Sequence, residues 1–109
     1  MTKFIQVVTT VDKKDMAEKI ALHVLEQKLA ACVQISNCTS LFRWQGKVEN
    51  ASEYICNMKS SEELYPLLEK AIHKMHPYDV PEILATPVLN GSESYLLWLD
   101  AELQNITSV

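Results

Sequence analysis

The sequence predicts an α+β domain of ferredoxin-like βαββαβ order with a long central hairpin and a C-terminal helix, and it predicts that this domain forms an oligomer. Two long runs of strand formers meet at Gln45-Gly46, and an apolar stripe at helical spacing lies on either side of them. Shorter strand-forming runs precede the first stripe and follow the second. This order predicts one antiparallel sheet with two helices on one face. The other face then needs cover, which a partner subunit would supply.

The central hairpin is the feature that predicts an oligomer. Each arm has about a dozen residues, which at ~3.3 Å per residue reach roughly 40 Å. A compact domain of this size has a radius of gyration of ~13 Å, and hence a diameter of about 35 Å. The tip should therefore overhang the core. Exposed edge strands that carry Phe42, Trp44 and Tyr54 favour aggregation unless another subunit pairs with them.

The first strand and helix are predicted from residues 4 to 29. Phe4 to Val11 is a run of strand formers without strict alternation, which suits a central strand that is covered on both faces. Asp12 is the expected helix cap. The helix is indicated by apolar residues at helical spacing, namely Ala17, Ile20, Ala21, Val24, Leu25 and Leu29.

A second helix is predicted after the hairpin. Ser60 to Glu63 matches a capping box, but Pro66 conflicts with so early a cap, so we expect the helix to begin near Glu62 or Glu63. It should end before Pro77. Its apolar stripe is Leu64, Leu67, Leu68, Ala71, Ile72 and Met75.

The last part of the chain predicts a strand and a closing helix. Val80 to Leu89 is typical of a strand, but Pro81 and Pro87 require it to bend or to run along an edge. A turn at Asn90-Gly91 follows, and Ser92 or Ser94 can cap a short terminal helix.

Composition narrows the class of protein. The 109 residues fit a single domain, 1–109, and 48% hydrophobic content supports a packed core. A net charge of -4 opposes nucleic acid as the main partner. No stretch approaches the ~18 apolar residues of a membrane span, and no secretory signal is present, so we expect a cytoplasmic protein without membrane contact.

Chemistry-bearing motifs are sparse. Only two glycines are present, so there is no glycine-rich phosphate loop, and no Gly-x-Ser-x-Gly elbow occurs. We therefore expect no enzymatic activity. Cys32, Cys38 and Cys56 are odd in number and lack tight spacing, which predicts free buried thiols rather than a disulfide or a metal cluster.

Five segments carry a family resemblance across nearly the whole chain, in the family's order and spacing. They are Val7-Val-Thr-Thr10, Lys28-Leu-Ala-Ala-Cys-Val33, Thr39-Ser-Leu-Phe-Arg-Trp-Gln-Gly-Lys47, His76-Pro-Tyr-Asp-Val-Pro-Glu-Ile83 and Tyr95-Leu-Leu-Trp-Leu99. Together they resemble the CutA family of divalent-cation-tolerance proteins. The resemblance implies a ferredoxin-like subunit, a tight cytoplasmic homotrimer similar to the signalling proteins of nitrogen regulation, and an association with copper and other divalent metals without an established reaction.

The resemblance also points to metal positions. Members linked to copper binding carry a Cys in the first strand and two adjacent His residues before the Pro-Tyr pair. This sequence has Thr9 at the first position and Met75 before His76, so only His76 of that set is present.

The candidate metal ligands are His76, His73 and Glu82. Imidazole is a common ligand of Cu²⁺ and Zn²⁺, but His76 also suits the end of a helix, so a ligand role and a structural role both remain open. His73 lies three residues earlier and can share a face with it. Glu82 stands in an otherwise apolar strand, where it lines a pocket or pairs with Lys47, Lys59 or Arg43 across a subunit boundary.

The aromatic residues Trp44, Tyr78 and Trp98 either line a small-molecule cleft between subunits or pack at the interface. We place Lys47 and Lys59 in the same interface or cleft. The leading hypothesis is a homotrimer that binds copper or another divalent cation and supports metal tolerance. The alternative is a trimeric small-ligand sensor, for an anion or a metabolite, or an interaction scaffold.

Overall fold

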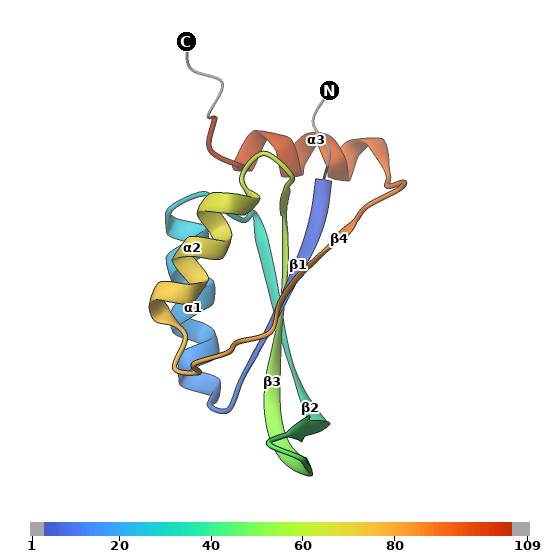
Figure 1. The fold of residues 1–109 in the computed structure, drawn as a ribbon. Helices are drawn as coiled ribbons and strands as arrows, with labels where there is room; N and C mark the ends of the chain where they lie inside the picture. Colours follow the sequence, from blue (N-terminus) through green and yellow to red (C-terminus); the bar gives the residue numbers. More distant parts are fainter. Residues whose placement is uncertain (1–3, 106–109) are drawn as a thin grey trace.

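The structure, a computed structural model, describes residues 4–105 as one four-stranded antiparallel sheet and three helices (Figure 1). The sheet order is β2-β3-β1-β4. In chain order the elements are β1 (Phe4–Val11), α1 (Lys14–Glu26), β2 (Cys32–Trp44), β3 (Lys47–Ser61), α2 (Tyr65–Met75), β4 (Ile83–Pro87) and α3 (Glu93–Glu102). The predicted α+β class and element order are confirmed. Among these residues no helix is long and apolar enough to cross a membrane.

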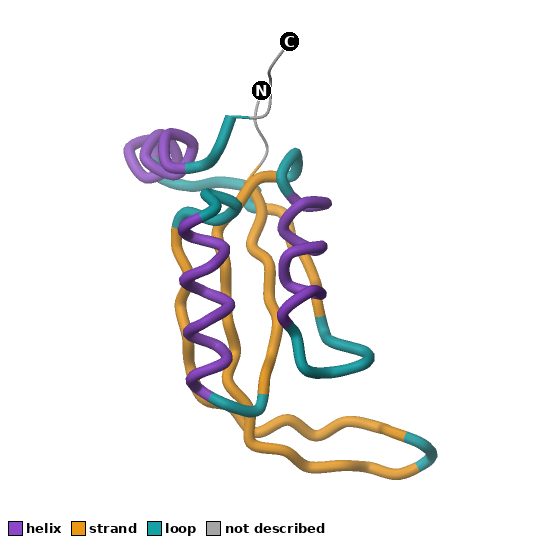
Figure 2. Tube along the Cα trace, turned by 90° about the vertical axis from the view of Figure 1, so that its left-hand side faces the viewer, coloured by secondary structure: helices purple, strands orange, loops and turns teal. Residues whose placement is uncertain are grey.

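Helices α1 and α2 cover one face of the sheet, as Figure 2 shows. Because side chains alternate across a strand, β1 divides its residues between the two faces. Ile5, Val7 and Val11 are buried in the core, whereas Gln6 and Val8 between them are only partly buried. The second face is therefore the less covered of the two.

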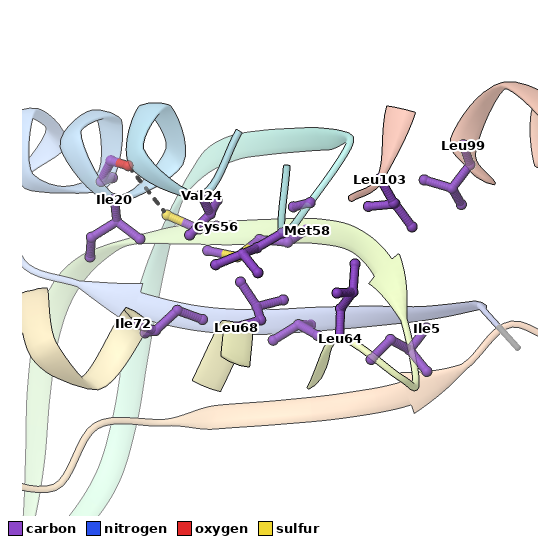
Figure 3. Packing of buried hydrophobic residues seen from close by; sticks show 14 of the residues in the cluster. Ile5, Ile20, Val24, Cys56, Met58, Leu64, Leu68, Ile72, Leu99 and Leu103 are labelled. Atoms are coloured by element: carbon purple, nitrogen blue, oxygen red, sulfur yellow. Dashed lines mark hydrogen bonds between the residues drawn. The ribbon is translucent and has the colours of Figure 1, made fainter. Parts of the chain in front are cut away.

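The core lies between this sheet and the two helices (Figure 3). Cys56 of β3 is fully buried there, and its thiol points at the backbone oxygen of Ala17 in α1, 3.9 Å away. Burial raises the pKa of this thiol to about 11. All three cysteines are free, as predicted, but only Cys56 is buried, whereas Cys32 and Cys38 are partly exposed. The largest fully buried side chains include Ile20, Met58, Leu64, Leu68, Ile72 and Leu99.

The hairpin is as long as the sequence predicts. β2 and β3 pair continuously from Cys32↔Lys59 to Trp44↔Lys47. Gln45 and Gly46 form the two-residue turn, and both have positive φ, 50° and 80°. Positive φ at both residues is the conformation that a two-residue hairpin turn needs, because the twist of the turn then matches the twist of the two strands. The molecule extends 47 × 27 × 23 Å, and the hairpin tip reaches well beyond the helices (Figure 1).

The outer half of the hairpin bends away from the sheet, beneath the loop that follows α2 (Figure 2). Its large apolar side chains remain open to solvent in a single chain. Phe42 is 42% exposed and Trp44 is 47% exposed, while Leu41 and Val48 exceed 60%. Such surface on a protruding edge is unusual for a monomer.

The predicted cap of α1 and the predicted start of α2 are both wrong. Lys13, not Asp12, is the N-cap of α1, and no side chain caps it. Helix α2 begins at Tyr65 rather than near Glu62 or Glu63, and β3 continues to Ser61. Ser60 does not cap the helix, in agreement with the conflict expected from Pro66, because its hydroxyl donates to the backbone oxygen of Leu29, 2.6 Å away. Pro66 lies in the first turn of α2, where a missing N–H costs no helical bond.

The predicted strand from Val80 to Leu89 is too long, because β4 pairs with β1 only from Ile83 to Pro87. Pro81 lacks an N–H for a ladder bond, and the segment before Ile83 crosses from the end of α2 to the sheet edge without pairing. The terminal helix was predicted correctly. Ser92 is its N-cap, and its hydroxyl accepts a hydrogen bond from the Tyr95 N–H at 3.4 Å.

Candidate functional site

The outer hairpin and the segment after α2 enclose an open cleft of about 910 Å³. One wall comes from the bent half of β2 and β3, the other from residues 78–82, and Thr10 at the end of β1 lies between them. The lining residues are Thr10, Thr39, Ser40, Leu41, Phe42, Trp44, Glu49, Ala51, Glu53, Tyr78, Asp79, Val80 and Glu82.

The cleft is acidic. Four carboxylates line it, from Glu49, Glu53, Asp79 and Glu82, and none of the lining residues is Lys, Arg or His. Glu49, Asp79 and Glu82 are exposed, whereas Glu53 is only 7% exposed. Clefts lined by one sign of charge concentrate ligands of the opposite sign. This lining favours cations and opposes anions.

His76 fastens the segment that forms one wall. Its Nε2 lies 2.9 Å from the backbone oxygen of Thr10, and the Tyr78 N–H donates to its Nδ1 at 3.2 Å. A carbonyl oxygen can only accept, so Nε2 carries the proton and Nδ1 accepts. Both ring nitrogens of the neutral imidazole are therefore occupied. Binding a metal through Nε2 would break the hydrogen bond that holds the wall to β1, and binding one through Nδ1 would break the bond within the 76–78 segment.

Tyr78 connects that wall to the hairpin. Its hydroxyl donates to Glu53 Oε2 at 2.7 Å, and its ring meets the His76 ring edge-on, with centroids 4.7 Å apart. Burial, together with this hydrogen bond to Glu53, raises the pKa of the Tyr78 hydroxyl. The phenol therefore remains a donor at neutral pH, and the 76–78 segment is tied to β1 and β3 together.

The structure brings three of the predicted site residues together, because Trp44, Tyr78 and Glu82 all line the cleft. His76 lies behind the wall, hydrogen-bonded to Tyr78. His73 is exposed on α2.

The remaining predicted residues lie elsewhere. Lys47 is exposed beside the hairpin turn, and Lys59 donates to Gln34 Oε1 across β3 and β2 at 2.8 Å. Trp98 packs against Tyr95 on α3, with ring centroids 5.5 Å apart.

Sequence reasoning missed Glu53, Glu49 and Asp79. Glu53 stands in a strand whose neighbours are polar, so nothing in the pattern marks it as buried. Its role depends on Tyr78, which is 25 residues away and reaches it only because the hairpin bends. Asp79 adjoins the predicted Tyr78, and an acidic residue next to that aromatic was the one available signal.

Metal-ligand geometry is incomplete in one chain. Among residues 4–105 no group of three or more His, Cys, Asp or Glu side chains is placed to hold a metal ion. A site needs three or four ligands.

Comparison with known proteins assigns the chain to a family. The CutA1 divalent ion tolerance protein model matches residues 5–102. The chain belongs to the CutA1 family. It is 40% identical over 94 residues to the divalent-cation tolerance protein CutA of Thermus thermophilus, spanning 85% of this chain and 91% of that protein.

Two further CutA proteins place the chain in the same family. It is 37% identical over 102 residues to the chloroplastic CutA of Arabidopsis thaliana, and there it spans 56% of the relative's length. The crystal structure of CutA1 from Shewanella sp. SIB1 shares the fold, with a TM-score of 0.90 at 35% identity, covering 94% of this chain and 96% of that one.

The two substituted family positions differ in their surroundings. Thr9 is fully buried on the core side of β1, opposite Cys56, and its hydroxyl oxygen has no hydrogen-bond partner. Met75 packs against the core at the end of α2. Neither side chain lines the cleft. In this CutA1-family chain the Thr9 position therefore lies on the core side of the sheet and not in the cleft.

Replacing Thr9 by Val should stabilise the protein. A buried hydroxyl without a partner costs about 1–3 kcal/mol, and Val removes it while keeping the β-branched shape, so we expect the free energy of unfolding to rise by roughly 1 kcal/mol. Urea unfolding at one fixed protein concentration measures this change. Thr39→Val, at an exposed hairpin position, is the control and should change little. Destabilisation by Thr9→Val would mean that the hydroxyl has a partner.

Stability should fall at acidic pH because of His76. Burial lowers its pKa below the usual value, and the nearby His73 acts in the same direction, although the Thr10 oxygen, Glu53 and Asp12 oppose them. The unfolded chain then takes up the proton first. Stability is full above about pH 6.5 and is lost as pH falls through that value toward the folded pKa.

Thermal unfolding between about pH 7.5 and pH 5 tests this dependence, because that range spans the ordinary His pKa. His76→Gln should be less stable at neutral pH and should flatten the slope, whereas His23→Gln should keep it. An unchanged slope in His76→Gln would show that another group is responsible.

Proposed function

We propose that this CutA1-family protein is a homotrimer that binds divalent cations weakly in the cleft and supports metal tolerance without catalysing a reaction. The observation that carries the proposal is the set of exposed carboxylates of Glu49, Asp79 and Glu82 around a cleft that no basic residue lines. Carboxylate oxygens are ligands for divalent ions, and their field attracts cations. The matching relatives are named for divalent-cation tolerance.

Assembly is supported by what a single chain leaves exposed. The hairpin tip, the β4 edge and α3 each carry large apolar side chains in contact with solvent, among them Trp44, Leu84 and Leu97. Contiguous exposed apolar surface on a soluble protein marks an interaction site. A ring of identical copies covers such surfaces without creating new edges, and the family resemblance implies three copies.

Weak binding follows from the ligand set. Three exposed carboxylates on two different walls are not held in one coordination sphere, so water or ligands from a neighbouring copy would have to complete it. This chain is poorly suited to the copper binding that the resemblance implies, because both ring nitrogens of His76 are hydrogen-bonded within the protein. Oxygen-rich sites suit harder ions than copper.

A small-ligand sensor is the second candidate function, and the aromatic lining of the cleft favours it. Phe42, Trp44 and Tyr78 supply apolar surface that a metal ion would not use. The four carboxylates would repel an anionic ligand. Of the anion and the metabolite considered as ligands of a sensor, the anion is therefore the poorer fit.

Metal titration tests the leading proposal. Calorimetry with Zn²⁺ and with Cu²⁺ should show weak binding that falls about tenfold in the double variant Asp79→Asn/Glu82→Gln, because each lost carboxylate removes a ligand and a charge. Glu69→Gln, on α2 outside the cleft, is the matched control. His76→Gln should reduce the affinity less than the double variant does, because it loosens the wall but removes no carboxylate from the cleft. A large loss in His76→Gln, with the double variant unchanged, would contradict the carboxylate site.

Trp44→Ala should weaken assembly by a few kcal/mol, about the cost of truncating a large aromatic side chain that becomes buried in an interface. Sedimentation velocity across a dilution series measures the change. Leu67→Ala is the control, because Leu67 has a similar exposure, 45%, but lies on α2 away from the hairpin. Wild-type assembly and thermal stability in Trp44→Ala would show that the tip does not contact a neighbour.

A further inference from the structure

The outer half of the hairpin carries two exposed cationic residues, Arg43 and Lys47, one on each side of the turn. Arg43 pairs with Val48 in the ladder. Since successive side chains of a strand point to opposite faces, Arg43 lies on the other face from its neighbours Phe42 and Trp44, which line the cleft. We call the face with Arg43 and Val48 the back of the hairpin.

The back of the hairpin has no partner within its own chain. Val48 is 67% exposed, and the Arg43 guanidinium forms no ion pair or hydrogen bond with residues 4–105. This face points away from the chain's own cleft, so the carboxylates there do not pair with Arg43 of the same chain. An arginine beside exposed apolar surface on a protruding edge favours contact with another molecule.

The cleft offers the groups that the back of the hairpin lacks. Asp79 and Glu82 present exposed carboxylates on the wall after α2, and no Lys, Arg or His lines the cleft. Phe42, Trp44 and Tyr78 add aromatic surface. A guanidinium suits this combination, because it can pair with a carboxylate through two parallel hydrogen bonds and can stack on an aromatic face.

Arg43 fits the cleft better than the other two cationic residues considered as partners of Glu82. Lys59 lies on the sheet outside the outer half of the hairpin and already donates a hydrogen bond there. Lys47 pairs with Trp44 and so lies on the front of its own hairpin. Its ammonium group is also a compact, strongly hydrated charge that gains less than a guanidinium from aromatic surface.

The back of the hairpin and the cleft are two different surfaces of one chain. A contact between them is therefore head-to-tail, and such a contact generates a ring when the rotation between copies closes. In a ring of three, every copy inserts one hairpin and receives another. The same contact covers Phe42 and Trp44 with the neighbouring copy.

We propose that Arg43 of each copy enters the cleft of the next copy, where its guanidinium pairs with the carboxylates of Asp79 and Glu82 and packs on Trp44. This pairing rests on the homotrimer proposed above and specifies the residues that join its copies. It also accounts for weak binding of divalent cations, because a metal ion competes with the arginine for the same carboxylates.

The rate at which assembled copies exchange tests the pairing, because interface substitutions act mainly on dissociation. Unlabelled and isotope-labelled protein are mixed, and native mass spectrometry follows the formation of mixed trimers. Arg43→Gln should exchange about tenfold faster than the wild type, or faster still, since it leaves two carboxylates in the interface without their cation. Lys70→Gln loses the same charge on α2 and is the control, with exchange at the wild-type rate.

Combined substitutions show whether Arg43 and the two carboxylates meet. Asp79→Asn/Glu82→Gln should accelerate exchange to a similar extent, and adding Arg43→Gln should accelerate it no further, because all three changes remove one pairing. All these positions are exposed in a single chain, so the variants should fold. Independent effects would multiply to about a hundredfold and would overturn the proposal. Wild-type exchange in Arg43→Gln, or faster exchange in Lys47→Gln alone, would also overturn it, whereas a monomeric wild type would refute the homotrimer itself.

Divalent-cation binding gives a second measurement. Calorimetry of assembled Arg43→Gln with Zn²⁺ should show an affinity about fivefold higher than that of the wild type, because the competing guanidinium is gone. Lys70→Gln should bind Zn²⁺ as the wild type does. Equal affinities in Arg43→Gln and the wild type would contradict a shared cleft. No Zn²⁺ binding by any of these proteins would refute the metal role alone, since the exchange rates test the pairing without metal.

Discussion

The unbroken pairing of β2 with β3 is the constraint on which the rest of the structure depends. Their ladder runs from Cys32↔Lys59 to Trp44↔Lys47, but β1 pairs with β3 only as far as Val11↔Tyr54. Beyond that point the two strands have no third neighbour among residues 4–105. Backbone hydrogen bonds hold the extension together, whereas nothing in the described part of the chain covers its apolar side chains. The need for a partner follows from this mismatch in length.

The same mismatch creates the cleft. The unsupported half of the hairpin bends beneath the segment after α2 (Figure 2). Phe42, Glu49 and Glu53 of the hairpin therefore line the same cleft as Tyr78 and Glu82. His76 holds that segment against β1, and Tyr78 ties it to Glu53. A histidine that sequence reasoning placed among metal ligands thus has a structural part in the wall. The acidic and aromatic character of the cleft comes from the hairpin and this segment together.

Patterns that repeat along the chain were predictable. The apolar stripes locate α1 and α2, and the Gln45-Gly46 break locates the turn, because periodicity and turn chemistry are local properties. Hydrogen bonds made by individual side chains were harder to predict than these repeating patterns. The Ser60 hydroxyl could have bonded to a helix N–H or to a backbone oxygen distant in the sequence. Because β3 continues to Ser61, Ser60 lies in the strand and its hydroxyl donates to the backbone oxygen of Leu29. Likewise, β4 is shorter than its apolar run because Pro81 cannot join the ladder.

The cleft itself could be predicted only in part. Trp44, Tyr78 and Glu82 were identified because aromatic or charged residues stood out from their neighbours, yet Glu53 was not, since it becomes important only through a contact 25 residues away. The position of His76 at the end of a helix was predictable. Its hydrogen bond to the Thr10 oxygen was not, because that bond depends on how α2 packs against β1, and a metal-ligand role for His76 therefore remained an alternative.

Sedimentation equilibrium of the wild-type protein tests the central claim most directly, because it reports mass without reference to shape. If the overhanging hairpin needs neighbours, the protein at about 1 µM should have the mass of three chains. Any dissociation of the trimer on dilution should be accompanied by a fall in the thermal stability of the protein. A stable, soluble, folded monomer at that concentration would contradict the account.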